Sequence, residues 1–242
     1  MPPPPLPERG PGAKGDRILT PQHHLPADIE RTSLKIIAAE LAELGLTPPP
    51  ETEAVVRRVI HTTADFDYAK NLRFTPGAVQ KAVEALHKGA FIVTDTNMAL
   101  AGITKPGLAK LGGQAACYMA DPEVAARAKA EGTTRAVAAM HKAAAEHPGA
   151  ILAVGNAPTA LLTIAEQIEA GLRPALVIGV PVGFVNVVES KERLFVTCEA
   201  HGVPAIVAMG LKGGSNVAAA ICNALIYSAA EMLDPTARGW NG

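Results

Sequence analysis

The sequence predicts an α/β protein with a three-layer α/β/α, flavodoxin-like fold. In such a fold a doubly wound, mainly parallel sheet of five strands lies between two layers of helices, here with extra N-terminal helices. Five short apolar runs are continuous rather than alternating, as in strands buried on both faces. Helical segments separate the runs, as in parallel sheets. The runs are 90–93, 115–119, 150–154, 175–179 and 205–209.

Three helices are predicted before the first of these strands. Residues 28–44 repeat apolar side chains at three-to-four spacing and are followed by a glycine. A run of prolines then leads into a second helix, which carries His61 near its end. After a polar turn at 65–71, a Thr-Pro-Gly sequence at 75–77 starts the third helix, with threonine as the cap and proline at the first helical position.

Composition excludes several classes of protein. A formal net charge of −1 gives no general attraction to nucleic acid or to an anionic membrane. No apolar run approaches the roughly 18 residues that a membrane span needs. Cys117, Cys198 and Cys222 are widely spaced, which predicts reduced cysteines in a cytoplasmic protein. The proline-rich segment 1–26 is expected to be disordered, because it is too poor in apolar residues to offset its ordering entropy.

His61 has two interpretations. On a helical projection Val59 and Ile60 belong to an apolar face, whereas His61 lies on the side of Arg57 and Arg58. A histidine in this position is either a solvated surface residue or a proton donor and acceptor at the mouth of a site. In the second case the arginines would be available to an anionic ligand.

The segments after the strands are the predicted places for ligands, because doubly wound sheets bind ligands beyond the carboxyl ends of their strands. They are 94–97, 119–122, 155–159, 180–186 and 210–216. Asp95 could be a ligand contact or a helix cap. Arg135 stands in the first turn of a predicted helix, where a cation is unfavourable, so a task other than helix stability is indicated. Phosphate-loop, dinucleotide, nucleophile-elbow and HExxH motifs are all absent from the sequence.

Together, eight stretches in this order resemble the precorrin-8X/cobalt-precorrin-8 methylmutase family of cobalamin (vitamin B12) biosynthesis. The resemblance covers about 28–229 and is carried by Ile29–Glu40 with Ser33, Val59-Ile60-His61, Thr75–Val79, Val93–Ile103 (VTDTNMALAGI), Gly132–Arg135, Val154–Leu161, Gly179–Lys191 (GVPVGFVNVVESK) and Lys212–Ala218.

The resemblance implies an isomerase that moves a methyl group from C-11 to C-12 of the corrin-forming ring. The family's proton-donating histidine falls on His61, whose implied role is to protonate a ring nitrogen. The family positions give two substrate contacts, and the strand-end argument adds four more. They are Ser33 and Arg135, then Thr94, Asp95, Asn97 and Asn156.

The resemblance also implies the partners of this domain. The 94–98 stretch looks more like the cobalt-containing branch of the family, so cobalt would arrive inside the corrinoid tetrapyrrole substrate. No cofactor and no protein metal site are then expected. A homodimer with its site near the interface is implied, and transient contact with neighbouring pathway enzymes is compatible with it.

The methylmutase domain would span 27–233, with a tail at 234–242. Leu34 departs from the family, where an aromatic residue is expected.

Three alternative functions are considered. A non-catalytic corrinoid carrier would keep the fold and most ligand contacts, and the presence of His61 argues against it. A flavodoxin-like cobalamin-binding module would carry a DxHxxG loop, which the sequence lacks. A nucleotide-binding regulator is disfavoured because the phosphate loops are missing.

Overall fold

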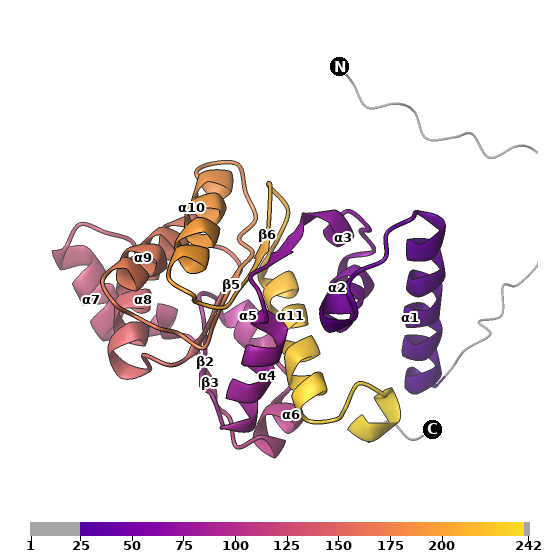
Figure 1. Ribbon diagram of the computed structural model, residues 1–242. Coiled ribbons are helices and arrows are strands. Elements are labelled where there is room, and N and C mark those ends of the chain that lie inside the picture. The colour runs from indigo at the N-terminus through magenta and orange to yellow at the C-terminus, as the bar shows by residue number, and fades with distance from the viewer. Residues whose placement is uncertain (1–24, 240–242) are drawn as a thin grey trace, which may run out of the picture.

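The predicted α/β fold is confirmed by a computed structural model that describes residues 25–239 (Figure 1). Its sheet has six strands in the order β1-β6-β5-β4-β2-β3. Five of them are parallel and correspond to the five predicted runs, in the flavodoxin-like order. They are β2 (Ile92–Thr94), β3 (Ala115–Ala116), β4 (Ile151–Val154), β5 (Leu176–Gly179) and β6 (Ala205–Ala208). The prediction of disorder for 1–26 falls outside the described residues, apart from Leu25 and Pro26.

The sixth strand, β1 (Leu72–Phe74), is missing from the sequence prediction. It pairs antiparallel with β6 at the edge of the sheet. Leu72 is buried and Arg73 is exposed, so only one face of this strand is covered. A three-residue strand with a central arginine is too short to show a pattern, and it forms because β6 offers an unpaired edge.

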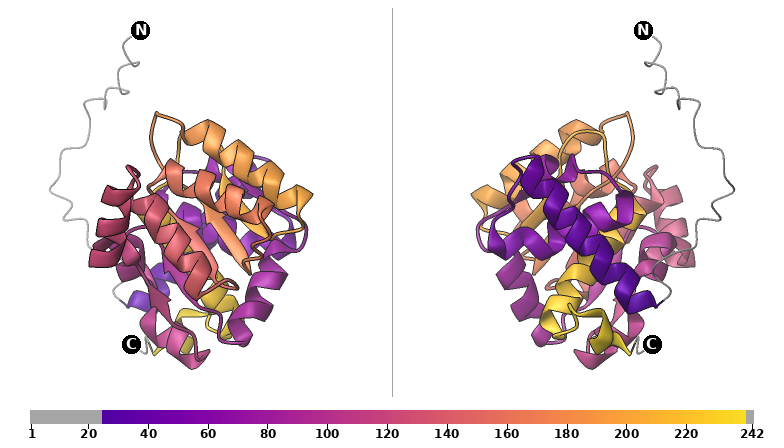
Figure 2. Two further views of the ribbon diagram at one scale, coloured as in Figure 1. Left: turned by 90° about the vertical axis from the view of Figure 1, so that its left-hand side faces the viewer. Right: turned by 90° about the vertical axis from the view of Figure 1, so that its right-hand side faces the viewer.

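Helices cover both faces of the sheet, and one further helix lies outside them (Figures 1 and 2). One face carries α7 (Pro122–Ala130), α8 (Arg135–Glu146), α9 (Pro158–Glu169) and α10 (Val187–Ala200), after the short η1 (Tyr118–Ala120). The other carries α2 (Pro50–Thr63), α3 (Tyr68–Asn71), α4 (Ala78–His87), α5 (Asn97–Gly102), α6 (Lys105–Lys110) and α11 (Ser215–Ala229). Helix α1 (Pro26–Glu43) packs on the outside of α2, as the right-hand view of Figure 2 shows.

Four of the five parallel strands, β2, β4, β5 and β6, supply both halves of the core, which explains their continuous apolar sequences. In β4, Ile151 and Ala153 join the cluster on the α2 and α11 side, whereas Leu152 and Val154 join the cluster under α8, α9 and α10. Helix α11 lies against the sheet and is covered in turn by α2, α4 and α5. This buried helix is the support on which α2 rests.

The segment after Leu233, predicted as a tail, contains a short helix that packs on α1. This helix, η2 (Pro235–Arg238), lies beside the start of α1 in Figure 1. The Asp234 carboxylate caps it and also accepts a hydrogen bond of 2.7 Å from Arg31 on α1. Between residues 25 and 239 no helix is both long and apolar enough to cross a membrane.

The carboxyl edge of the sheet is closely packed where β4 meets α11, and this gives a stability test. A Cβ atom added at Gly155 would stand 2.7 Å from the Ser215 Cα atom and 2.9 Å from the Gly214 oxygen. Both neighbours are backbone atoms that cannot move aside, so we expect Gly155→Ala to lower the free energy of unfolding by about 1–3 kcal/mol in urea titrations. Gly149→Ala, which meets nothing within 4 Å, should stay within about 0.5 kcal/mol of wild type. Equal effects at both sites would contradict this packing.

Candidate active site

The end of α2 brings His61 against Ser33 of α1. The Ser33 hydroxyl oxygen lies 2.7 Å from the His61 Nδ1 atom, at hydrogen-bond distance. Val59 and Ile60 are buried against the core, whereas His61 is half-buried, as the helical projection predicts. Because Nδ1 is occupied by serine, Nε2 is the ring nitrogen left for a ligand.

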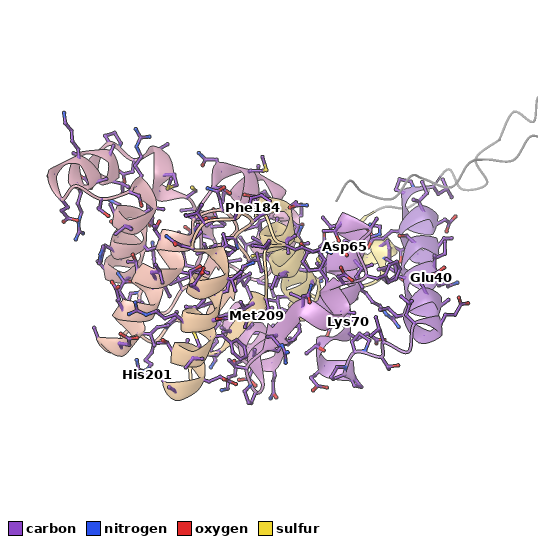
Figure 3. The ribbon with its side chains drawn as sticks, turned by 90° about the horizontal axis from the view of Figure 1, so that it is seen from above. Glu40, Asp65, Lys70, Phe184, His201 and Met209 are labelled. Carbon is purple, nitrogen blue, oxygen red and sulfur yellow. The ribbon has the colours of Figure 1, made fainter. Side chains whose placement is uncertain are left out.

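These two side chains line an apolar groove between α1 and the end of α2. Its volume is about 630 Å³, within the usual range for small-molecule sites. The lining residues are Ile29, Thr32, Ser33, Ile36, Ile37, Glu40, Ile60, His61, Ala64 and Phe66. In Figure 3, which shows the molecule from above, Glu40 marks the α1 side of the groove, and Asp65 marks the turn after α2, between the lining residues Ala64 and Phe66. The exposed side chains of Ile29 and Ile36 thus form part of a ligand-sized apolar wall.

Burial and nearby charges keep the His61 imidazole neutral at pH 7. Burial lowers its pKa below the ordinary value of 6.5, and the Arg58 guanidinium lowers it further. The Glu30 carboxylate acts in the opposite direction, and Arg238 adds a smaller lowering effect. A protonated His61 would therefore be a stronger acid than histidine in water.

The turn after α2 is fixed by ion pairs. Ala64 ends the helix in the left-handed region, with φ of 53°. The Lys212 ammonium group then donates to the Asp65 and Asp67 carboxylates, at 2.7 and 2.6 Å. The hydrogen bond from Lys212 lowers the pKa of the Asp67 carboxyl group. Both carboxylates are thus engaged in holding the turn to the loop after β6.

Asp95, predicted as a substrate contact, is bonded within the protein. Its buried carboxylate accepts hydrogen bonds of 2.8 Å from the backbone N–H groups of Gly155, Asn156 and Ala157. Burial raises the pKa of this carboxyl group, and the three N–H bonds oppose that shift. Asp95 thereby joins the ends of β2 and β4, at the point where the strand order reverses.

The other predicted contacts differ in their availability to a ligand. Thr94 is buried, and its hydroxyl donates to the Thr96 oxygen at 3.0 Å. Asn97 and Asn156 are exposed. Arg135 is exposed at the first position of α8, next to the cap Thr134, and pairs with no carboxylate among the described residues. Of the predicted contacts at the carboxyl edge, these three have side chains that are exposed to a ligand.

The predicted site residues therefore form two groups. Ser33 and His61 lie between α1 and α2, whereas the other five lie at the ends of β2 and β4 and at the start of α8. In Figure 1, α2 and α8 are on opposite sides of the sheet. Within residues 25–239 no hydrogen bond or ion pair joins the two groups directly, and no cluster of three or more His, Cys, Asp or Glu side chains could hold a metal.

Lys191 is fully buried on α10, and its sequence position alone predicts no role for it. Its ammonium group donates to the Gly210 oxygen at 2.8 Å and to the Lys212 oxygen at 2.9 Å. Burial lowers its pKa to about 8. Lys191 thus anchors the loop whose Lys212 holds the turn after His61. The only feature of the sequence that points to Lys191 is its place at the end of 179–191, one of the stretches that carry the family resemblance.

The chain is similar to several known proteins. The sequence model of a family described as precorrin-8X methylmutase matches residues 28–228. The chain is 45% identical over 213 residues to the cobalt-precorrin-8 methylmutase of Salmonella typhimurium, covering 85% of this chain and 97% of that protein. It is 38% identical over 198 residues to the precorrin-8X methylmutase of Pseudomonas aeruginosa, covering 81% and 93%. The solved structure of a Thermus thermophilus precorrin-8X methylmutase superposes with a TM-score of 0.75, at 42% identity and 84% and 98% coverage.

The lowered pKa of His61 can be measured directly. In NMR titrations of histidine-labelled protein, assigned with the His61→Asn variant, we expect the His61 imidazole to titrate below pH 6.5. The unfolded chain then takes up this proton first as the pH falls. The contribution of His61 to stability is therefore complete above about pH 6.5 and is lost as the pH falls through the folded pKa. A midpoint at or above 6.5 would show that burial and Arg58 do not control this group.

Proposed function

The chain belongs to the precorrin-8X methylmutase family, and we propose that it moves the C-11 methyl group of cobalt-precorrin-8 to C-12, giving cobyrinic acid, with His61 as the general acid. The methylmutases are isomerases of cobalamin biosynthesis that act on a corrinoid tetrapyrrole. The observation that carries the proposal is the Ser33–His61 pair in an apolar groove. An acid at an apolar wall suits the rearrangement of a large, flat macrocycle.

The cobalt-containing substrate is favoured by two observations. Of the two curated relatives described above, the more similar one is named for cobalt-precorrin-8. The Thr94–Met98 stretch also looks more like the cobalt branch of the family. Cobalt then belongs to the substrate. Because the methyl group moves within one molecule, the reaction calls for no redox or group-transfer cofactor.

His61 and Ser33 have separate tasks in this mechanism. Ser33 holds Nδ1, so that Nε2 is directed to a ring nitrogen of the substrate. His61 is neutral in the free protein, and the carboxylates of the bound substrate would stabilise its protonated form. Proton transfer from Nε2 makes the ring system a better electron sink while the methyl group migrates. Since an isomerisation has no net proton uptake, the proton returns to His61 afterwards.

The substrate's carboxylates need polar partners beyond the groove. Arg135, Asn97 and Asn156 are the exposed candidates at the carboxyl edge of the sheet. Arg135 can bind a carboxylate through two parallel N–H bonds. We assign Asp95 and Thr94 the task of fixing the loops that carry these contacts, because both are already bonded within the protein.

The role of His61 is tested by conversion under anaerobic conditions. Wild-type protein should convert cobalt-precorrin-8 to cobyrinic acid, followed by the visible spectrum. His61→Ala should lose about 100- to 10,000-fold in rate, because the general acid is gone. The control is His201→Ala, an exposed histidine at the end of α10 (Figure 3), which should convert substrate like wild type.

Each alternative gives its own result in this assay. Tight binding of the corrinoid without conversion by wild type would leave the carrier function and remove the mutase. Equal conversion by wild type and His61→Ala would keep the enzyme and exclude His61 as its acid.

We also propose a homodimer, supported by apolar side chains on the loops at the carboxyl edge. Phe184 is 89% exposed in the loop labelled in Figure 3, and Met98, Val182 and Val185 are exposed as well. Isolated apolar side chains are common on surfaces, but Val182, Phe184 and Val185 lie within four residues of one loop, which favours an interaction site.

Light scattering should therefore give a mass about twice the 25.0 kDa of one chain. Phe184→Glu should lower this mass, because it places a charge in the contact. Val196→Glu, at an exposed apolar position on α10, should not change it. A monomeric wild type, or a Phe184→Glu dimer as stable as wild type, would contradict this surface.

A further inference from the structure

A buried ion cluster lies next to the His61 site. The Glu30 carboxylate of α1 accepts hydrogen bonds of 2.6 Å from Arg58 of α2 and from Arg238 of η2. The three side chains are only 6%, 11% and 5% exposed. Removing one partner of a buried cluster leaves an uncompensated charge, so the stability of the cluster depends on all three side chains.

The aromatic ring of Tyr227, on α11, contacts both arginines of this cluster. The Arg58 and Arg238 guanidinium groups lie 5.2 and 4.4 Å from the centre of the ring, close enough for cation–π contacts. Tyr227 is on α11, which supports α2. The cluster thus connects α1, α2, η2 and α11.

The cluster and the candidate catalytic pair are one helical turn apart. Glu30 precedes Ser33 by three residues on α1, and Arg58 precedes His61 by three residues on α2. Residues three apart on a helix lie on the same face. The Glu30–Arg58 bond and the Ser33–His61 contact are therefore adjacent links between the same two helices.

We propose that Arg238 is a positioning residue of the His61 site: by holding Glu30 beside Arg58 it fixes α1 on α2 and thereby sets the contact between Ser33 and His61. Arg238 does not touch the groove and lies beyond the 28–228 range that the family model matches. In this proposal η2 stabilises the position of α1 and, through it, the geometry of the candidate active site. The catalytic consequence rests on the function proposed above, whereas the positioning of α1 does not.

The charge of Arg238 also affects the pKa of His61. The charged groups acting on His61 are Arg58 on its own helix, Glu30 on α1 and Arg238 on η2. Loss of the Arg238 charge would raise the pKa of His61, because a nearby cation disappears and the Glu30 carboxylate is less neutralised. A looser α1 would also expose the imidazole to water and shift its pKa upward.

The test compares Arg238→Gln, which removes the charge but keeps much of the stem, with Arg238→Lys, which keeps the charge. In Arg238→Gln we expect a higher titration midpoint for His61 by NMR and about tenfold faster hydrogen exchange for the α1 amides, with α8 and α9 unchanged. Turnover of cobalt-precorrin-8 should fall about 10- to 100-fold, because the pair is misplaced. Arg238→Lys should recover most of all three properties.

A matched control is Arg193→Gln, which removes an exposed arginine of α10 that pairs with Glu169. It should behave like wild type in every measurement. The proposal is overturned if Arg238→Gln leaves α1 exchange and His61 titration unchanged, or if exchange rises equally in all helices. Should wild type fail to convert the substrate, the proposed function fails, while the exchange and titration results still decide the role of Arg238.

Discussion

The packing of α1 on α2 is the contact on which the candidate site depends. Each helix supplies one wall of the groove and one member of the Ser33–His61 pair. Helix α1 lies outside the layer that covers the sheet, and it leaves much of its own surface exposed. Its position therefore depends on a few apolar side chains, such as Ile37 and Leu41, and on a buried polar cluster. An acid placed at this junction is half-buried, close to charge and still open to a ligand.

The rest of the molecule gives this junction a rigid base. The parallel sheet is buried on both faces, and α11 lies between it and α2. At the carboxyl edge, buried Asp95 and Lys191 use their charges to hold backbone groups of neighbouring loops. Charged groups satisfied in this way fix loop positions without offering themselves to a substrate. The proposed methyl migration needs one acid and firm positioning, and the half-buried His61 at the end of α2 is the candidate for that acid.

Much of this fold can be predicted from the sequence because its signals are local. Strands buried on both faces are continuous apolar runs, and the face of His61 follows from helical periodicity. The antiparallel edge strand could not be predicted, because its three residues carry no pattern of their own. Contacts between residues far apart in the sequence could not be predicted either. The family resemblance gave Ser33 as a substrate contact, but nothing in the sequence indicated its contact with His61. Nothing local indicates either that Glu30 meets Arg238, which lies 208 residues further along the chain. Asp95 stood where a ligand contact was expected, but neighbouring N–H groups occupy its carboxylate.

The role proposed for the groove and for His61 can be tested by a crystal structure of the protein with cobyrinic acid bound. We expect the macrocycle to lie in the groove between α1 and α2. One of its ring nitrogens should be within hydrogen-bond distance of the His61 Nε2 atom, with Ser33 still bonded to Nδ1. A bound macrocycle with every ring nitrogen out of reach of the His61 Nε2 atom would rule this arrangement out. In that case His61 could not deliver a proton to the ring, and the acid would have to be sought among other residues.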